Sequence, residues 1–377
     1  MIIDAHAHIF PYLGGASGFD SPETHLKYWQ EAIASNPAAS VRKVDDDSLA
    51  TDPSLWNMLD EDGKPIDVNF RVGNFGRFLW TKEGIDYYVH VYAPSLETMT
   101  ASPEFMLAQM AWAGIDMAIL QNPWLYGQLN EYFSKAGRTF PQKFAGQVQV
   151  KEFEIDRPEE IENLRKAVDK LDLNGGLYFT DKRAWEYGYK NHIDDKKYFP
   201  FWEEVRSLEL PVSMDLSALV DPEHPDWSAL ERYSAQMRRF NHLTDQFPEI
   251  QFTLVHGILL TVFGIGDEIV IPEEIWNIWK KPNIHIEILF PIQVSYPRPG
   301  ASVWDYPYPQ ARLAIKELYK RLGTEKLIWG SDMPNVERNC TYKQSLDYLT
   351  QYCDFIPSKH MDLIIGGNAA RLLKLDI

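Results

Sequence analysis

From residue 105 onward, short apolar runs alternate with longer stretches in which apolar residues recur every three or four positions. Short apolar runs are typical of buried parallel strands, and the longer periodicity is typical of amphipathic helices. The predicted strands are 115–121, 144–150, 175–179, 210–214, 251–255, 284–289 and 327–330. The predicted helices are 106–113, 129–136, 158–171, 199–207, 230–246, 275–280, 309–322, 342–352 and 368–373.

The first four residues add one more apolar strand at the start of the chain. Strands that alternate with helices form right-handed crossovers and a parallel sheet, and eight such units indicate a (β/α)8 TIM barrel. We therefore predict an α/β fold in which residues 1–377 form a single barrel domain. An open doubly wound sheet is the alternative, but it would normally carry a glycine-rich nucleotide loop after the first strand, where this chain has His6 and His8.

Residues 9–105 do not alternate cleanly between strand and helix, yet they are rich in aromatic residues. A disordered linker would be poor in aromatics, so this segment is predicted to be an ordered insertion after the first strand. We expect it to cover the barrel mouth as a lid, and the alternative is a peripheral lobe that only stiffens the fold. The aromatic residues are Tyr12, Phe19, Tyr28, Trp29, Trp56, Phe70, Phe75, Phe78, Trp80, Tyr87 and Tyr88.

The net charge of −17 argues against nucleic acid or an anionic membrane as a partner and leaves a small-molecule substrate as the expected one. The longest apolar stretch, 252–266, is too short to span a bilayer. Cys340 and Cys353 show neither metal spacing nor a disulfide framework, which is typical of a reducing compartment. No basic segment precedes an apolar one at Met1, so we expect a cytoplasmic protein, and a homo-oligomer remains open.

Polar residues stand where the predicted strands end, which is the end at which barrel enzymes carry their chemistry. Residues two apart on a strand share a face, so His6 and His8 point the same way and can bind one divalent metal. The alternative is a pair of hydrogen-bonded histidines at a strand terminus. The other strand-end candidates are Tyr178, Asp215, His256, Glu287 and Asp332.

Four segments of the chain, 3–8, 254–257, 328–334 and 367–373, resemble the amidohydrolase superfamily. Within it the chain looks most like the branch that joins metal-dependent hydrolases to decarboxylases of the aminocarboxymuconate-semialdehyde and resorcylate type. The resemblance covers both ends and most of the predicted barrel, but not the insertion. It implies a TIM-barrel enzyme that needs a divalent metal.

The resemblance implies a role for each matching residue. His6 and His8 resemble the two metal ligands of the first strand, and Asp332 resembles the aspartate that contacts the metal and handles a proton. His256 is similar to a histidine that either binds metal or polarises the substrate. Zn²⁺ suits two imidazoles and a carboxylate, and additional oxygen ligands would favour Mn²⁺.

The chain departs from the family pattern at the fifth strand, where the family usually has a metal-binding histidine and this chain has Asp215. Asp215 either replaces that histidine as an oxygen ligand, or the ligand is absent and Asp215 caps the turn 216–218. Glu287 alternates with isoleucines along its strand, which favours a supporting role over direct ligation.

Substrate-binding candidates are the strand-end Tyr178 and, in the insertion, Arg71 and Arg77. The two arginines lie among aromatic residues and could clamp a substrate carboxylate, although two surface arginines fit the pattern as well. The leading hypothesis is a metal-dependent hydrolase of a small cyclic or carboxylate-bearing molecule that uses a metal-activated water. The alternatives are a non-oxidative decarboxylase of an aromatic or unsaturated acid and a catalytically silent ligand-binding barrel.

Overall fold

The computed structural model describes residues 1–35, 40–181, 192–216, 224–265, 268–289 and 306–375. Among these residues, eight strands pair in parallel, and most of their residues are buried, as expected for strands that are covered on both faces. These strands are β1 (Ile3–Ala7), β6 (Met117–Leu120), β7 (Phe144–Gly146), β8 (Leu177–Thr180), β9 (Val212–Asp215), β10 (Phe252–Leu254), β13 (Ile284–Ile288) and β14 (Leu327–Trp329).

The parallel strands form two sheets, with the orders β1-β6-β7 and β14-β13-β10-β9-β8. The sheets meet at both of their edges. Val148, just after β7, forms a parallel bridge with Leu177 of β8, and Ala7 of β1 forms one with Met333, just after β14. The first and last parallel strands are therefore neighbours, although more than three hundred residues separate them in sequence.

Helices follow the parallel strands from β6 onward, and several begin and end at the signals expected of them. Ser102 caps α2, the adjacent Pro103 opens it, and Gly114 ends it in the left-handed conformation (φ 78°). Ser228 with Glu231 forms a capping box at the start of α6. The helices are α2 (Pro103–Ala113), α3 (Asn130–Thr139), α4 (Pro158–Asp169), α5 (Phe199–Ser207), α6 (Ala229–Gln246), α7 (Leu260–Phe263), α8 (Glu273–Trp279), α10 (Pro309–Leu322), α11 (Tyr342–Thr350), α12 (Ser358–Asp362) and α13 (Asn368–Leu372).

The strands and helices predicted from residue 105 onward are confirmed, with ends that differ by a few residues. The pattern missed three small elements after β10, namely α7 and the hairpin of β11 (Gly264–Ile265) and β12 (Glu268–Ile269). It also missed α12 and a π-helical turn at Leu363–Gly367 that runs into α13.

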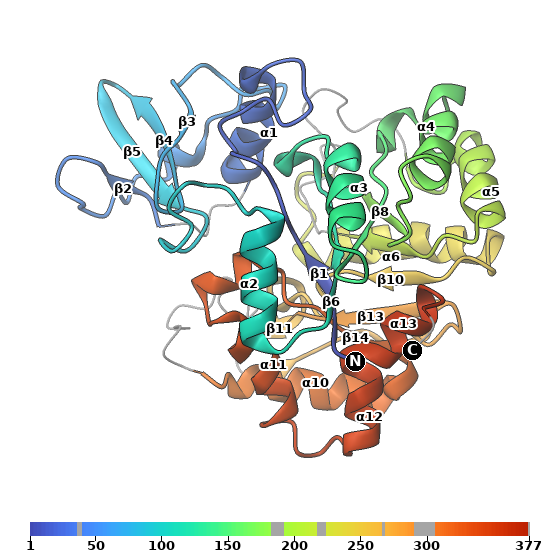
Figure 1. Cartoon of the computed structure of the whole chain (residues 1–377). Helices are drawn as coiled ribbons and strands as arrows, with labels where there is room; N and C mark the ends of the chain where they lie inside the picture. Colours follow the sequence, from blue (N-terminus) through green and yellow to red (C-terminus); the bar gives the residue numbers. More distant parts are fainter. Residues whose placement is uncertain (36–39, 182–191, 217–223, 266–267, 290–305, 376–377) are drawn as a thin grey trace.

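The chain between β1 and α2 forms a helix and a four-stranded antiparallel sheet of order β2-β5-β4-β3, which Figure 1 shows to one side of the parallel strands. We call residues 9–105 the lobe. Several of its aromatic residues are buried, and Trp29 stacks on Phe78 with 4.5 Å between ring centroids, whereas Tyr12 and Phe75 are exposed. Its elements are α1 (Pro22–Ala34), β2 (Arg42–Lys43), β3 (Arg71–Val72), β4 (Arg77–Lys82) and β5 (Ile85–His90).

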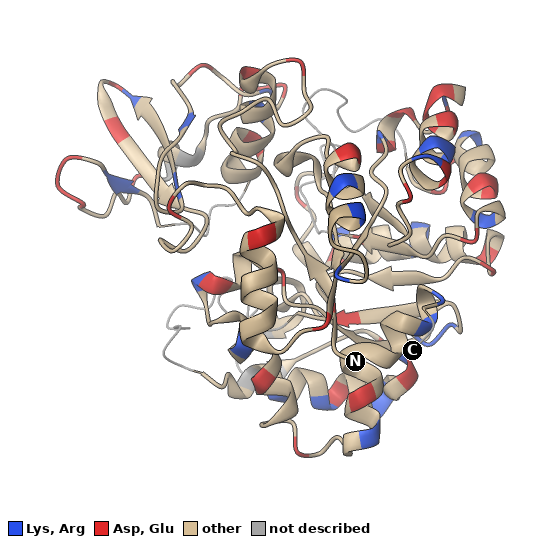
Figure 2. Cartoon of the chain, viewed as in Figure 1, with Lys and Arg blue, Asp and Glu red and all other residues tan. Residues whose placement is uncertain are grey.

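The two ends of the chain lie close together, as Figure 1 shows. Ile3 and Ala5 of β1 share a small apolar cluster with Ala369 and Ala370 of α13. Figure 2 shows basic and acidic residues interspersed along the outer helices α4, α5 and α12. In the described part of the chain, every helix is too short or too polar to cross a membrane.

Candidate metal centre

The two histidines of β1 and one aspartate after β14 converge on one point. Nε2 of His6 lies 3.1 Å from Nε2 of His8. Oδ1 of Asp332 lies 2.9 Å from Nε2 of His8 and 3.7 Å from Nε2 of His6. Among the described residues, these three form the one group of potential metal-ligand atoms that all lie within 4.8 Å of one another. All three side chains are buried.

The hydrogen bonds on the far side of each ring decide which atoms face the convergence point. Nδ1 of His6 lies 3.0 Å from Oε2 of Glu287, and Nδ1 of His8 lies 2.9 Å from the carbonyl oxygen of Gln121. Both oxygens are acceptors, so each Nδ1 donates a proton and each Nε2 keeps its lone pair. When both rings are neutral, two nitrogen lone pairs and a carboxylate therefore face one another, and a cation or a proton is needed between them. A divalent cation fits this donor set, and imidazoles oriented by a carboxylate or carbonyl are typical of metal ligands.

The pKa values of the three groups show how strongly the cluster attracts positive charge. Burial acts to lower the pKa of His6, but the carboxylates of Glu287, Asp332 and Asp4 raise it to about 9. Burial acts to raise the pKa of Asp332, but His8 and His6 lower it to about 2. Burial lowers the pKa of His8. The carboxylate of Asp332 is therefore ionised over the physiological range, and one positive charge between the histidines is strongly favoured.

The turn after β14 places Asp332 beside the histidines. The N–H of Asp332 donates to the carbonyl oxygen of His6 (2.7 Å), and Asp332 itself has left-handed backbone (φ 62°). Gly330 lies two residues before Asp332, at a position where a side chain would not fit. A Cβ atom there would lie 2.7 Å from Cβ of His6 and 2.7 Å from Oε1 of Glu287. The absence of a side chain at Gly330 allows His6 and Glu287 to approach the end of β14.

Asp4, two residues before His6 on the same face of β1, holds this turn against the strand through hydrogen bonds. Its carboxylate accepts hydrogen bonds from the N–H groups of His6 (3.0 Å) and Ser331 (2.9 Å), from the Ser331 hydroxyl and from the hydroxyl of Tyr342 (2.6 Å). Burial raises the pKa of Asp4 to about 6, although these donors act to lower it. Asp4 therefore holds β1 and the Asp332 turn in register.

Glu287 on β13 joins His6 to His256. Its carboxylate lies against Nδ1 of His6 and also accepts the backbone N–H of His256 at 2.8 Å. Glu287 is fully buried, and the structure gives it the supporting role that its alternation with isoleucines favours. His256 follows β10, and its ring centroid lies 5.5 Å from that of His6.

Asp215 ends β9 and contacts two of the other sequence candidates. Its Oδ2 accepts the hydroxyl of Tyr178 at 3.0 Å, and its Oδ1 lies 3.4 Å from Nδ1 of His256. The structure thus brings Tyr178, Asp215 and His256 together beside the cluster, while Asp215 itself is not part of the group of three. That Asp215 ligates metal stays a prediction, and the turn 216–218 that it would cap lies partly outside the described residues.

Three packed aromatic rings, those of Trp29, Phe10 and Tyr126, connect the lobe to the cluster of His6, His8 and Asp332. We call them the aromatic wall. The ring of Tyr126 lies 4.6 Å from that of His8 and stacks on Phe10 at 4.8 Å. Trp29 of the lobe meets Tyr126 edge-on at 5.8 Å. Asn335 then ties this wall to the carboxylate, because its amide donates to the hydroxyl of Tyr126 and to Oδ1 of Asp332, both at 2.9 Å.

Arg71 and Arg77 make their contacts within the sheet of the lobe. Arg71 pairs with Asp86 at 2.7 Å, and Arg77 lies over the ring of Tyr88 and donates to His90. Within the described part of the chain, neither arginine contacts the His6, His8 and Asp332 cluster. These contacts are those expected if both residues are surface arginines. A substrate-clamping role for the two arginines stays a prediction.

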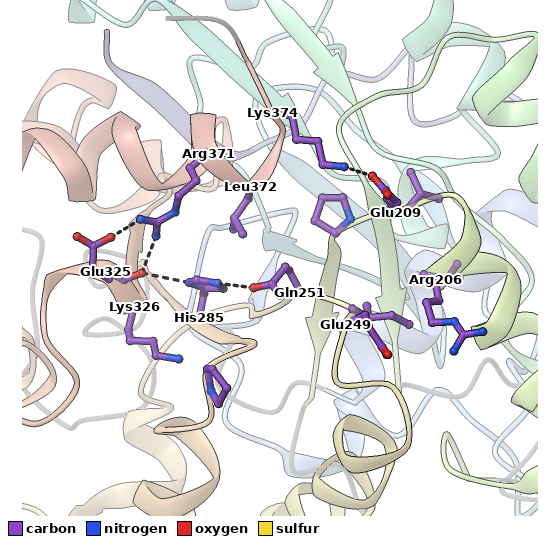
Figure 3. Close-up of a pocket in the computed structure, with 15 residues that line it drawn as sticks. Arg206, Glu209, Glu249, Gln251, His285, Glu325, Lys326, Arg371, Leu372 and Lys374 are labelled. Carbon is purple, nitrogen blue, oxygen red and sulfur yellow. Dashed lines mark hydrogen bonds and ion pairs between the residues drawn. The ribbon is translucent and has the colours of Figure 1, made fainter.

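A hollow of about 690 Å³ lies at the opposite end of the parallel strands. Figure 3 shows the residues that line it. Several of its lining residues directly precede β9, β10, β13 and β14, whereas His256 and Asp332 follow their strands. The cations of the hollow are already engaged. Arg371 and Lys374 pair with glutamates, and Lys326 donates to the carbonyl oxygen of Ile284. The amino ends of barrel strands usually serve stability, so the chemistry is expected at the other end.

Sequence reasoning missed Asn335, Tyr126 and Gln121. Gln121 follows β6, in a position equivalent to the other strand-end candidates, so the strand-end rule could have found it. Asn335 stands three residues after Asp332, at a spacing that allows a side-chain contact across one turn. Tyr126 carried no signal of its own, since its contact with His8 depends on the path of the loop.

The chain belongs to the amidohydrolase family, because the model of that family matches residues 3–375. No curated protein sequence matches the chain. The amidohydrolase fold is a TIM barrel and the enzymes are metal-dependent, in agreement with the α/β fold, the parallel sheets and the cluster of two histidines and an aspartate.

Solved structures of enzymes resemble the chain in fold. A dihydroxybenzoic acid decarboxylase from Polaromonas sp. JS666, with bound manganese and the inhibitor 2-nitroresorcinol, has a TM-score of 0.51 at 15% identity and covers 72% of this chain and 85% of its own. A 4-oxalomesaconate hydratase from Rhodopseudomonas palustris has a TM-score of 0.51 at 16% identity (72% and 80%). A probable 2-pyrone-4,6-dicarboxylic acid hydrolase from Acinetobacter baumannii, with citric acid bound, has a TM-score of 0.51 at 15% identity (73% and 90%).

Proposed function

We propose that the protein is a metal-dependent hydrolase that acts on a small carboxylate-bearing organic molecule. The observation that carries this proposal is the donor set, in which Nε2 of His6, Nε2 of His8 and an ionised carboxylate converge while Nδ1 of each ring is directed at an acceptor. A bound divalent ion, Zn²⁺ or Mn²⁺, supplies Lewis-acid polarisation there. His6, His8 and Asp332 are the proposed ligands.

The side chains at and around the proposed ligands have separate roles in proton transfer, in substrate binding and in positioning. The free oxygen of Asp332 accepts a proton from the attacking water, and its low pKa keeps it ionised and ready to do so. Asn335 fixes the orientation of that carboxylate through its amide. His256 faces the substrate and orients it by a hydrogen bond, while Glu287 holds His6 and the backbone of His256 in place.

We propose further that the eight parallel strands form one closed barrel, with residues 9–105 inserted after the first strand as a lid within a single domain of residues 1–377. The bridges from Val148 to Leu177 and from Ala7 to Met333 support closure. The contact of Trp29 with Tyr126, which itself lies against His8, supports a lid that excludes water from the site.

Non-oxidative decarboxylation of an aromatic or unsaturated acid is the second candidate. The proposed ligands are almost completely buried, and the ring of Tyr126, stacked on Phe10, lies 4.6 Å from that of His8. A dry, aromatic site suits the loss of carbon dioxide from a flat substrate better than the entry of water.

Isotope and gas analysis separates the two reactions. The protein is loaded with Zn²⁺ or Mn²⁺ and incubated in ¹⁸O-labelled water with a panel of lactones, amides and hydroxybenzoates. The proposal expects ¹⁸O in an acidic product and no carbon dioxide. Release of carbon dioxide without ¹⁸O incorporation would replace it with the decarboxylase, and no turnover with either metal on a panel of both substrate classes would contradict both.

A further inference from the structure

The carboxylate of Asp215 contacts two different neighbours, one with each of its oxygens. Its Oδ2 accepts the hydroxyl of Tyr178 from β8 at 3.0 Å, and its Oδ1 lies 3.4 Å from Nδ1 of His256. Asp215 is 1% exposed and Tyr178 is 3% exposed, so both interactions are shielded from water. The arrangement stands where the family pattern places a metal-binding histidine.

The backbone of His256 is fixed by a hydrogen bond of its own. His256 has left-handed backbone (φ 71°), and its N–H donates to Oε2 of Glu287 at 2.8 Å. With Nδ1 directed at Asp215, the second ring nitrogen, Nε2, is the atom left to meet a substrate. The side chain of His256 is 20% exposed, whereas those of His6 and His8 are 3% exposed.

We propose that Asp215 is not a metal ligand but the residue that positions His256, in a relay that runs from Tyr178 through Asp215 to His256. An ionised carboxylate accepts hydrogen bonds and cannot donate one, so the proton of neutral His256 stays on Nδ1. Nε2 then presents its lone pair to a hydroxyl or water at the substrate. The inference rests on the proposed function for what Nε2 contacts, but not for the relay itself.

In this relay Asp215 and Tyr178 are positioning residues, and His256 is the residue that touches substrate. Tyr178 has a specific task, because its hydroxyl donates to Oδ2 and thereby leaves Oδ1 to His256. The relay resembles the buried aspartate that fixes the tautomer of the histidine in serine hydrolases, where the asparagine variant keeps the geometry and loses activity through the wrong tautomer.

Replacing the carboxylate of Asp215 by an amide separates a positioning role from a metal-ligand role. Only the positioning role predicts a change in the tautomer of His256. In Asp215→Asn the hydroxyl of Tyr178 still needs an acceptor, so the amide oxygen turns to Tyr178 and the NH₂ group turns to His256. The NH₂ group donates to Nδ1, and the proton of the imidazole moves to Nε2. Removing the hydroxyl as well, in Tyr178→Phe with Asp215→Asn, frees the amide to turn its oxygen back to His256.

Nitrogen NMR of ¹⁵N-histidine-labelled protein reads the tautomer directly, and the signal of His256 is assigned by its loss in His256→Gln. Metal content, kcat and KM are measured on the same samples, and circular dichroism checks the fold. We expect an Nδ1–H tautomer in the wild type, an Nε2–H tautomer in Asp215→Asn, and a return to Nδ1–H in the double variant. Tyr178→Phe alone keeps the Nδ1–H tautomer and serves as the matched control.

Metal content is expected to stay unchanged in Asp215→Asn, while kcat falls roughly 10²- to 10⁴-fold and KM changes little, with about tenfold recovery in the double variant. An unchanged tautomer in Asp215→Asn would overturn the relay, and so would loss of metal from this variant. The tautomer is read without turnover, so a failure of the proposed function leaves this result interpretable.

Discussion

At the scale of single residues, Asp332 has two proposed roles, as a metal ligand and as the proton acceptor. Asparagine tolerates the left-handed backbone found there and keeps an oxygen for the metal, but it cannot take a proton. We predict that Asp332→Asn keeps much of its metal and loses turnover by roughly two to four powers of ten. Turnover and metal content measured on the same sample provide the check.

Two other results for Asp332→Asn would each have a clear meaning. Turnover close to that of the wild type would show that Asp332 only shapes the turn before Pro334, since asparagine serves equally well there. Parallel loss of metal and turnover would make Asp332 chiefly a ligand and would remove its role as proton acceptor.

Glu152, a buried carboxyl group outside the cluster, gives a prediction for stability against pH. Burial raises its pKa to about 8, although Trp124 donates a hydrogen bond to it at 2.6 Å. The folded chain therefore holds a proton that the unfolded chain releases near pH 4.5. The resulting contribution to stability is complete below pH 4.5 and is lost as the pH rises toward 8, by at most about 1.4 kcal/mol per pH unit.

We predict that Glu152→Gln flattens the decline of the free energy of unfolding between pH 6 and pH 8. Urea denaturation at several pH values measures that decline, and the exposed Glu131→Gln on α3 is the control. Equal slopes for the wild type and Glu152→Gln would show that Glu152 is already ionised in the folded protein.

At the scale of elements, the sheet of the lobe contacts the cluster through aromatic rings, because Phe78 of β4 stacks on Trp29 and Trp29 contacts Tyr126. If the lobe closes over the site, a ligand that binds beneath it will restrain it. We predict that limited proteolysis within residues 9–105 slows when a hydroxybenzoate or dicarboxylate, shown by calorimetry to bind, is present. Cleavage at the same rate with and without bound ligand would contradict the lid and leave a peripheral lobe.

The elements themselves were predictable to very different degrees. The parallel strands are short apolar runs between amphipathic helices, and this signal is local, so their positions from residue 105 onward were predicted closely. The sheet of the lobe was not predicted. β2 and β3 have two residues each, too few for an alternating pattern, and they depend on pairing with β5 and β4.

At the scale of the whole molecule, the fold explains why residues from the two ends of the chain meet. Met333 bridges to Ala7, and the Asp332 turn is fastened to β1 through Asp4. The meeting of His6, His8 and Asp332 was predictable, because a barrel makes its first and last strands neighbours. The contacts of Tyr126 and Asn335 were not, because they depend on how loops fold over the strand ends rather than on any periodic pattern.

The central claim is that His6 and His8, with Asp332, hold a divalent metal ion. The most direct test is the metal content, by plasma mass spectrometry, of wild type and of His6→Ala with His8→Ala after loading with Zn²⁺ or Mn²⁺ and removal of excess metal. His25→Ala is the control, because His25 is equally buried but bonds only to the carbonyl oxygens of Gly15 and Leu125. We predict about one ion per chain in the wild type and the control and almost none in the double variant, with the fold retained. Full metal content in the double variant would contradict the account.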